Sequence, residues 1–270
     1  MKSISVSRLG LAFLLLSATA CVGVTNSMTA DNLGEGKTQF AVSPSYVRLV
    51  GEGGSGGFMG GVQAQVLHGT SNTTDIGGRL SYQRVFITED GGGDFGVSGF
   101  GAEFLARTRL HRSDKLTLAL APSFGFNRIT LSSLGDSAGT NALQAKLPLL
   151  LGVPVGEHQF VGSVAVSDAL FFGEGDSTNT INVGATVGFA ARLPGTSVRV
   201  MPELGFLYPL IGSTPGSGSS FNDSGSFVLQ FSVGLMFGGG SGGGSQSDDD
   251  SGEQSEESDD SDDDSGDSDY

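Results

Sequence analysis

The residues that could do chemistry in this chain are few and widely separated. Each of the three histidines, His68, His111 and His158, adjoins a predicted turn at the end of a strand, and Cys21 is the only cysteine. A hydrolase of the usual kinds needs a histidine beside a nucleophile or an acid, and a zinc site needs clustered Cys and His ligands. Neither arrangement is visible in the spacing. We therefore expect no enzyme activity, no metal site and no cofactor.

Phosphate and nucleic-acid binding also lack their signatures. The glycine-rich stretches 51–61 and 91–101 contain no phosphate-binding loop motif and lead into no helix. The chain has a net charge of −15, but 13 acidic residues lie from Asp248 onward, which leaves about −2 for everything before them. A nearly neutral body without a basic cluster argues against a nucleic-acid partner.

Six charged residues share the small and polar face of segments in which apolar residues alternate with small or polar ones. They are Arg79, Glu103, Arg107, Lys146, Arg199 and Glu203. Side chains of a strand alternate between two faces. If the apolar face meets lipid, these six face the interior of a barrel, because an Arg or Lys on the lipid face at mid-membrane costs about 2–4 kcal/mol. They form either a salt-bridged plug that holds the barrel shut or the lining of a narrow polar pore.

The elements that must position these residues are long alternating strands. The segments run about 12 to 17 residues, whereas strands of soluble proteins are usually about 5–6 residues long and about 9–11 tilted residues cross a bilayer. The sequence predicts an all-β fold, a closed antiparallel up-and-down transmembrane β-barrel of ten strands, with eight as the alternative. The predicted strands are 37–50, 57–68, 74–87, 95–111, 115–130, 141–155, 158–172, 179–193, 196–211 and 225–237.

Connection lengths support the same fold. Tight connections at 112–114, 156–157 and 194–195 alternate with longer ones at 51–56, 88–94, 131–140, 173–178 and 212–224. Transmembrane barrels have short turns at one end and longer loops at the other. An even number of strands then places both ends of the barrel on the side of the short turns.

The last predicted strand, Val228 to Phe237, alternates apolar residues and closes on Phe. It resembles the terminal strand of bacterial outer-membrane barrels, and in size the chain is similar to small OmpA-like and opacity-type barrels. The resemblance implies outer-membrane lipid as the surroundings, the barrel assembly machinery as a partner during biogenesis, and N- and C-termini in the periplasm. In that family this strand usually ends the chain, whereas about 33 residues follow it here.

The two ends are predicted to lie outside the fold. Residues 1–20 have the charged start, short apolar run and small residues of a signal peptide. Cys21 follows directly and is a candidate for lipidation, or a residual cysteine after an ordinary cleavage. The remaining predicted units are an N-terminal linker 21–36, the outer-membrane barrel 37–237, a Gly/Ser linker 238–247 and a disordered acidic tail 248–270. The tail could bind divalent cations only weakly, because it lacks the spacing of a calcium loop.

These patterns predict a non-enzymatic outer-membrane barrel that serves as a structural or surface component of the envelope. Two alternatives stay open: a small passive channel of the porin kind, and a surface adhesin or ligand-binding barrel that uses its Ser/Gly/Asn-rich loops. A soluble β-sandwich or lipocalin-like barrel is the alternative outside the membrane.

Overall fold

The computed structural model describes residues 26–50, 58–88, 94–133, 136–172, 177–214, 218–221 and 227–239. None of the described segments is a helix long and apolar enough to cross a membrane. The strands are β1 Thr38–Val50, β2 Phe58–Gly69, β3 Thr74–Thr88, β4 Asp94–Arg112, β5 Thr117–Leu120, β6 Ser123–Ser133, β7 Asp136–Val155, β8 His158–Phe172, β9 Ser177–Arg192, β10 Arg199–Thr214, β11 Gly218–Phe221 and β12 Phe227–Gly238. The predicted signal peptide, Cys21 and the acidic tail lie outside the described residues.

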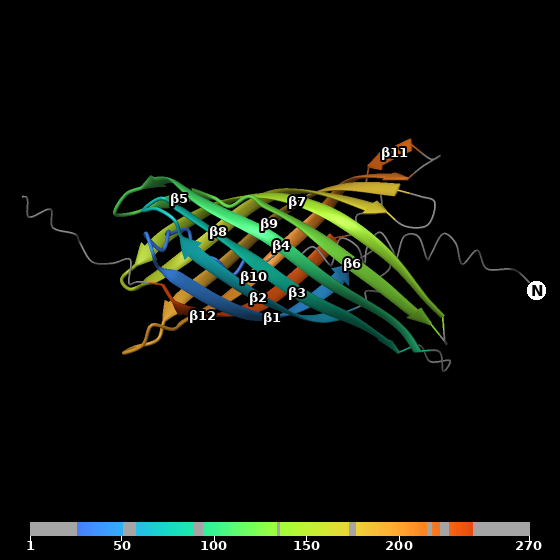
Figure 1. Cartoon of the computed structure of the whole chain (residues 1–270), viewed down its shortest axis with the longest axis horizontal. Helices are drawn as coiled ribbons and strands as arrows, with labels where there is room; N and C mark the ends of the chain where they lie inside the picture. The colour runs from blue at the N-terminus through green and yellow to red at the C-terminus, as the bar shows by residue number, and fades with distance from the viewer. Residues whose placement is uncertain are drawn as a thin grey trace, which may run out of the picture.

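These strands form a closed barrel (Figure 1). Apart from β5 with β6 and β11 with β12, neighbours in the chain pair antiparallel. β1 pairs with β12 along a register that includes Phe40 opposite Phe237, which closes the barrel. The barrel has ten strand positions, because β5 and β6 both lie between β4 and β7 and β11 pairs only with the end of β10. The prediction of ten antiparallel strands rather than eight is confirmed.

The fifth predicted strand, 115–130, is interrupted at Ala121 and Pro122. Proline has no backbone N–H to donate to a ladder, so β5 ends at Leu120 and β6 begins at Ser123. The seam is still closed by hydrogen bonds, since the Ala106 N–H donates to the Pro122 carbonyl at 3.0 Å and the Ala121 N–H donates to the Pro148 carbonyl at 2.9 Å.

The loop predicted at 131–140 is wrong in its extent. Strands β6 and β7 remain paired out to Ser133 opposite Asp136. Part of the loop predicted at 212–224 is also strand, because Thr214 pairs with Gly218 where β10 meets β11. Small polar residues suggested loops in both places, but a backbone ladder needs no apolar side chains, so strands can continue beyond their apolar zone.

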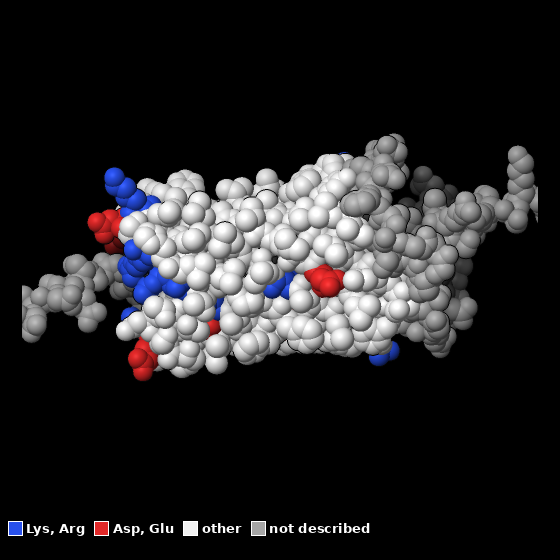
Figure 2. Space-filling model, turned by 90° about the horizontal axis from the view of Figure 1, so that it is seen from above, with Lys and Arg blue, Asp and Glu red and all other residues white. Residues whose placement is uncertain are grey.

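The barrel exposes apolar side chains and buries polar ones. Phe40, Phe104 and Val164 are more than half exposed on the outside. Inward positions of the same strands hold buried polar residues such as Ser43, Glu103 and Ser163. Figure 2 shows a flank that is mostly white, with charged side chains gathered at one end, others near its middle and a blue one at its lower edge toward the other end. That end carries the tight turns, where Arg112, Asp114 and Lys115 are exposed.

Candidate functional site: the barrel lumen and the segment inside it

The interior of the barrel contains a piece of the chain itself. Residues 26–33, called the lumen segment below, precede β1 and are buried apart from Asp31 and Asn32, which are intermediate. The chain reverses direction between this segment and β1 at Gly34 and Gly36, whose φ angles of 85° and 74° favour glycine. The sequence predicts only a linker for these residues.

The first residues of the lumen segment lie well inside the barrel. The backbone N–H groups of Asn26 and Ser27 donate to the two carboxylate oxygens of Glu203, at 3.1 Å and 3.0 Å. The Asn26 amide also donates to Ser163 at 3.1 Å, and the Ser43 hydroxyl donates to Ser27 at 2.7 Å. Ser163 and Ser43 each lie five residues after the first residue of their strands. The segment therefore extends from the tight-turn end toward the middle of the lumen.

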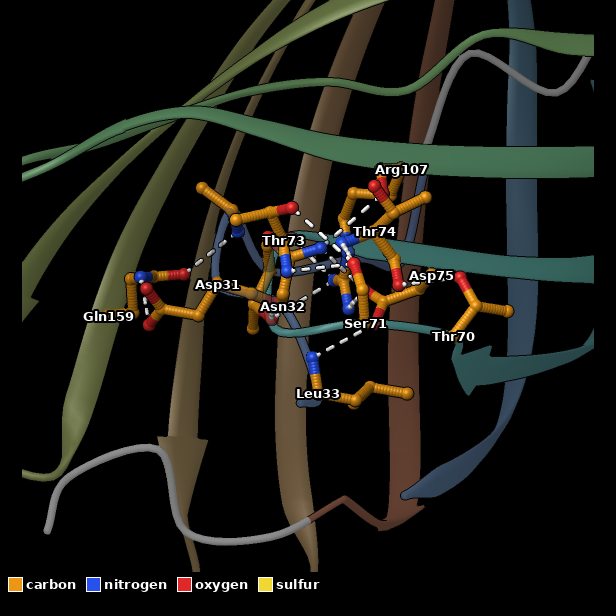
Figure 3. A network of polar contacts seen from close by, with 12 residues as sticks. Asp31, Asn32, Leu33, Thr70, Ser71, Thr73, Thr74, Asp75, Arg107 and Gln159 are labelled. Atoms are coloured by element: carbon orange, nitrogen blue, oxygen red, sulfur yellow. Dashed lines mark hydrogen bonds and ion pairs between the residues drawn. The ribbon is translucent and has the colours of Figure 1, made fainter. Parts of the chain in front are cut away.

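The other end of the lumen segment is held by the strand ends around the tight turns (Figure 3). Asp31 accepts hydrogen bonds from Thr117 at 2.9 Å and from the Gln159 amide at 2.8 Å. Asp75 accepts from the backbone N–H of Leu33 at 3.2 Å and from the side chain of Asn32 at 3.0 Å. Strands β3, β5 and β8 are thereby linked through one short stretch of chain.

One buried ion pair joins the lumen wall to the same stretch. Arg107 donates to Asp75 through Nε at 2.8 Å and Nη2 at 2.6 Å, and neither side chain is exposed. Its remaining nitrogen, Nη1, donates to the carbonyl oxygen of Thr29 at 2.8 Å. A charge buried this deeply requires partners with good geometry. The lumen segment supplies one of them, the carbonyl oxygen of Thr29.

Apolar contacts add to these polar ones. Met28, Ala30 and Leu33 belong to a buried cluster with inward-facing residues of the wall, namely Leu67, Leu105, Ala119, Ala121 and Leu150. Full burial of a side chain such as Met or Leu stabilises a protein by about 1.5–3 kcal/mol. The lumen near the tight turns is therefore a mixed core that needs the segment to complete it.

Glycines of the wall make room for the lumen segment. A Cβ on Gly152 would lie 2.8 Å from the Cβ of Ala30, and a Cβ on Gly234 would lie 3.3 Å from that of Ser27. The first distance is shorter than ordinary contacts between such atoms. The wall is thus shaped to the segment as well as bonded to it.

The six charged residues predicted to face the lumen all lie on inward positions, and five of them are buried. Glu103 binds both Arg79, at 3.3 Å, and Lys146, at 2.9 Å. Arg79 also donates to the carbonyl of Asn26 at 2.9 Å. Arg199, at the start of β10, is partly exposed and is attracted electrostatically by Asp31.

Glu203 differs from the expectation that it pairs with a basic residue across the lumen. Its two oxygens accept the backbone N–H groups of the lumen segment instead. Asp75, the partner of Arg107, was not among the predicted lumen residues, although it occupies the same face of β3 as Arg79 and could have been found by that position. The inward Leu67, Leu105 and Leu150 were a further signal, because apolar residues on a polar face indicate something apolar to cover.

The three histidines do not form a reactive group. His68 shares a hydrogen bond of 2.9 Å with Thr38, and His158 accepts the Arg192 N–H at 3.1 Å, while His111 is exposed. Within the described ranges, no three His, Cys, Asp or Glu side chains are grouped so that they could hold a metal ion.

No model of a known protein family matches the chain, and no curated protein matches it. Among solved structures it is similar to the translocator domain of the autotransporter NalP from Neisseria meningitidis, with 16% identity, a TM-score of 0.48, and coverage of 85% of this chain and 95% of that one. An outer membrane channel from Pseudomonas putida F1 has 11% identity, a TM-score of 0.43 and coverage of 79% and 100%. The attachment invasion locus protein Ail of Yersinia pestis has 12% identity, a TM-score of 0.37 and coverage of 76% and 99%.

Proposed function

We propose that the protein is a non-enzymatic outer-membrane barrel whose lumen is closed by its own N-terminal segment, and that it serves as a structural or surface component of the envelope. The membrane assignment is supported by the apolar outer face, on which rings such as Phe40, Phe124 and Phe160 are at least half exposed. A closed antiparallel barrel is one of the few folds that satisfies its backbone in lipid. The tight turns, the start of β1 and the end of β12 then lie on the periplasmic side.

The proposal that the lumen is closed depends on the position of the lumen segment inside the barrel. It bonds to wall residues from β1, β3, β4, β5, β8 and β10. A passive pore needs a continuous path of water through the lumen. Here the segment occupies that space, and Glu203 accepts hydrogen bonds from its backbone N–H groups. Closure supports a role in which the barrel anchors and presents its loops rather than conducts.

Fractionation and planar-bilayer recording test this proposal together. The protein should be found with the outer membrane, should require detergent for purification, and should show no discrete conductance steps when reconstituted. Recovery as a water-soluble monomer would remove the membrane assignment. Steady conductance of the unaltered protein would instead favour the second candidate, a small passive channel.

The channel candidate is favoured by one observation, the polar character of the wall beyond the lumen segment. Buried amides there include Gln63, Gln83, Asn127 and Gln144, and Asn127 donates to Gln144 at 3.1 Å. Such a lining suits water and ions once the segment is displaced. The adhesin candidate depends on the long loops, most of which lie outside the described residues.

Asp168 on β8 provides a test of which face meets lipid. Its side chain points outward between the exposed Val166 and Leu170, and it makes no ion pair with the described residues. Asp168→Leu should raise the free energy of unfolding by about 1 kcal/mol, because a carboxylate on a lipid-facing surface is unfavourable. Urea unfolding in lipid vesicles measures this change. Asp114→Leu, in an exposed turn, is the control and should change little; a loss of stability in Asp168→Leu would argue against lipid contact.

A further inference from the structure

Three arginines on the outer face repeat one local pattern. Each lies two residues beyond an exposed aromatic side chain on a strand that runs toward the long loops. The pairs are Tyr46 and Arg48 on β1, Tyr82 and Arg84 on β3, and Phe126 and Arg128 on β6. We call Arg48, Arg84 and Arg128 the arginine arc.

The strand register places the arginine arc at one height. Arg84 lies across from Tyr46 through Gly60, two residues before Arg48. Arg84 also lies across from Thr130 through Ser98, two residues beyond Arg128. From β1 to β3 and from β3 to β6, the arginine position therefore shifts by the same two residues in the same direction. Strands of a barrel tilt, so residues at equal height shift steadily along successive strands. From the strand spacing and rise, neighbouring arginines of the arc are about 12 Å apart.

The arginine arc covers only one side of the barrel. In the described parts of β8, β9, β10 and β12 the Lys and Arg residues are Arg192 and Arg199, and both lie at the tight-turn end. The outer face of β8 carries the acidic Asp168 instead. The charge on the outside is thus uneven, with positive groups over β1 to β6.

Aromatic rings beside the arc and just below it indicate its depth. Tyr46 stacks on Phe58 of the neighbouring strand, with ring centroids 6.1 Å apart, and Tyr82 lies across from Phe100. Aromatic side chains concentrate at the boundary between hydrocarbon and headgroups. Arginines one step beyond them reach headgroup level, where a positive charge on the outer face costs far less than at the middle of the membrane. A guanidinium group there can bind a phosphate through two parallel hydrogen bonds.

We propose that the arginine arc is a binding site for the phosphates of anionic lipid headgroups in the leaflet at the long-loop end. The site uses the outside of the barrel and is independent of whether the lumen conducts, although it rests on the proposal that the barrel spans a membrane. It would select lipids with a net negative headgroup and hold them along β1 to β6.

Native mass spectrometry of the full chain tests the site, with phosphatidylglycerol and phosphatidylcholine added to the detergent-solubilised barrel. The chain should retain phosphatidylglycerol preferentially. An arginine near a membrane surface contributes about 1 kcal/mol toward anionic lipid, which is roughly a fivefold preference. The combined variant Arg48→Gln, Arg84→Gln and Arg128→Gln should lower the preference at least about fivefold.

The matched control removes three positive charges from the opposite end through Lys37→Gln, Arg112→Gln and Lys115→Gln. It should keep the preference of the unaltered chain. Equal losses in both combined variants, or no preference in the unaltered chain, would overturn the site. The heat-dependent gel shift of a folded barrel shows that each variant has folded. A chain that needs no detergent would contradict the membrane proposal instead, so the two failures are distinguishable.

Discussion

Replacement of residues 26–33 by a Gly/Ser segment of the same length should turn a silent barrel into one that conducts ions. The replacement keeps the chain length but removes Met28 and Leu33 from their apolar contacts and leaves Asp75 without the Asn32 amide. A segment without these contacts has nothing to offset the entropy of ordering and should leave the lumen. The wall that it exposes carries polar and charged side chains beside the apolar Leu67, Leu105 and Leu150.

Planar-bilayer recording measures the effect as discrete conductance steps that are absent from the unaltered protein. The control replaces a stretch of equal length in the tail, residues 250–257, by Gly/Ser and should remain silent. If the lumen replacement folds and is equally silent, the segment is not what closes the barrel.

Loss of the Arg107–Asp75 pair should produce the largest loss of stability of any single ion pair in the described lumen. Both side chains are fully buried, and Arg107→Leu leaves the carboxylate of Asp75 without its cation. Breaking a buried pair in this way typically costs about 3–5 kcal/mol. Urea unfolding in lipid vesicles, followed by the gel shift of the folded barrel, measures the change.

Two comparisons sharpen this prediction. Arg112→Leu, at an exposed strand end, should change the unfolding free energy by no more than about 0.5 kcal/mol. Combining Asp75→Leu with Arg107→Leu should cost less than the sum of the single changes, because contacting residues are coupled. A loss below about 1 kcal/mol for Arg107→Leu alone would show that the pair does not hold the lumen together.

The fold was predictable because its signals repeat along the chain. Alternation of apolar and small residues in segments such as β12 indicates both the strand and its outward face, and ten such segments indicate closure. Where the repetition stops, prediction failed: Ser133 and Asp136 are paired in a hairpin although their polar neighbourhood suggested a loop. When neither face of a strand is apolar, its backbone pairing produces no alternating pattern in the sequence.

The lumen was predictable only in part. The alternation of side chains along each strand predicted that Arg79, Glu103 and Lys146 face inward, and the structure joins them in one ion-pair group. This alternation could not reveal that Glu203 accepts hydrogen bonds from backbone N–H groups. That contact depends on residues 26–33, which have no strand pattern of their own. A short segment that folds into a cavity is specified by the cavity, so its role is visible only with the wall in place.

The claim that the lumen segment lies against the inner wall can be tested directly by a disulfide. Ser27 and Ser43 have hydroxyl oxygens 2.7 Å apart, so Ser27→Cys with Ser43→Cys, in a chain that also carries Cys21→Ser, should cross-link on mild oxidation in intact membranes. The control pairs Ser27→Cys with Ser167→Cys, since Ser167 is also buried but on the inner face of β8. Rapid cross-linking to position 43 with none to position 167 is the expected result. No cross-link at position 43, or equal cross-linking at both positions, would contradict a lumen closed by this segment.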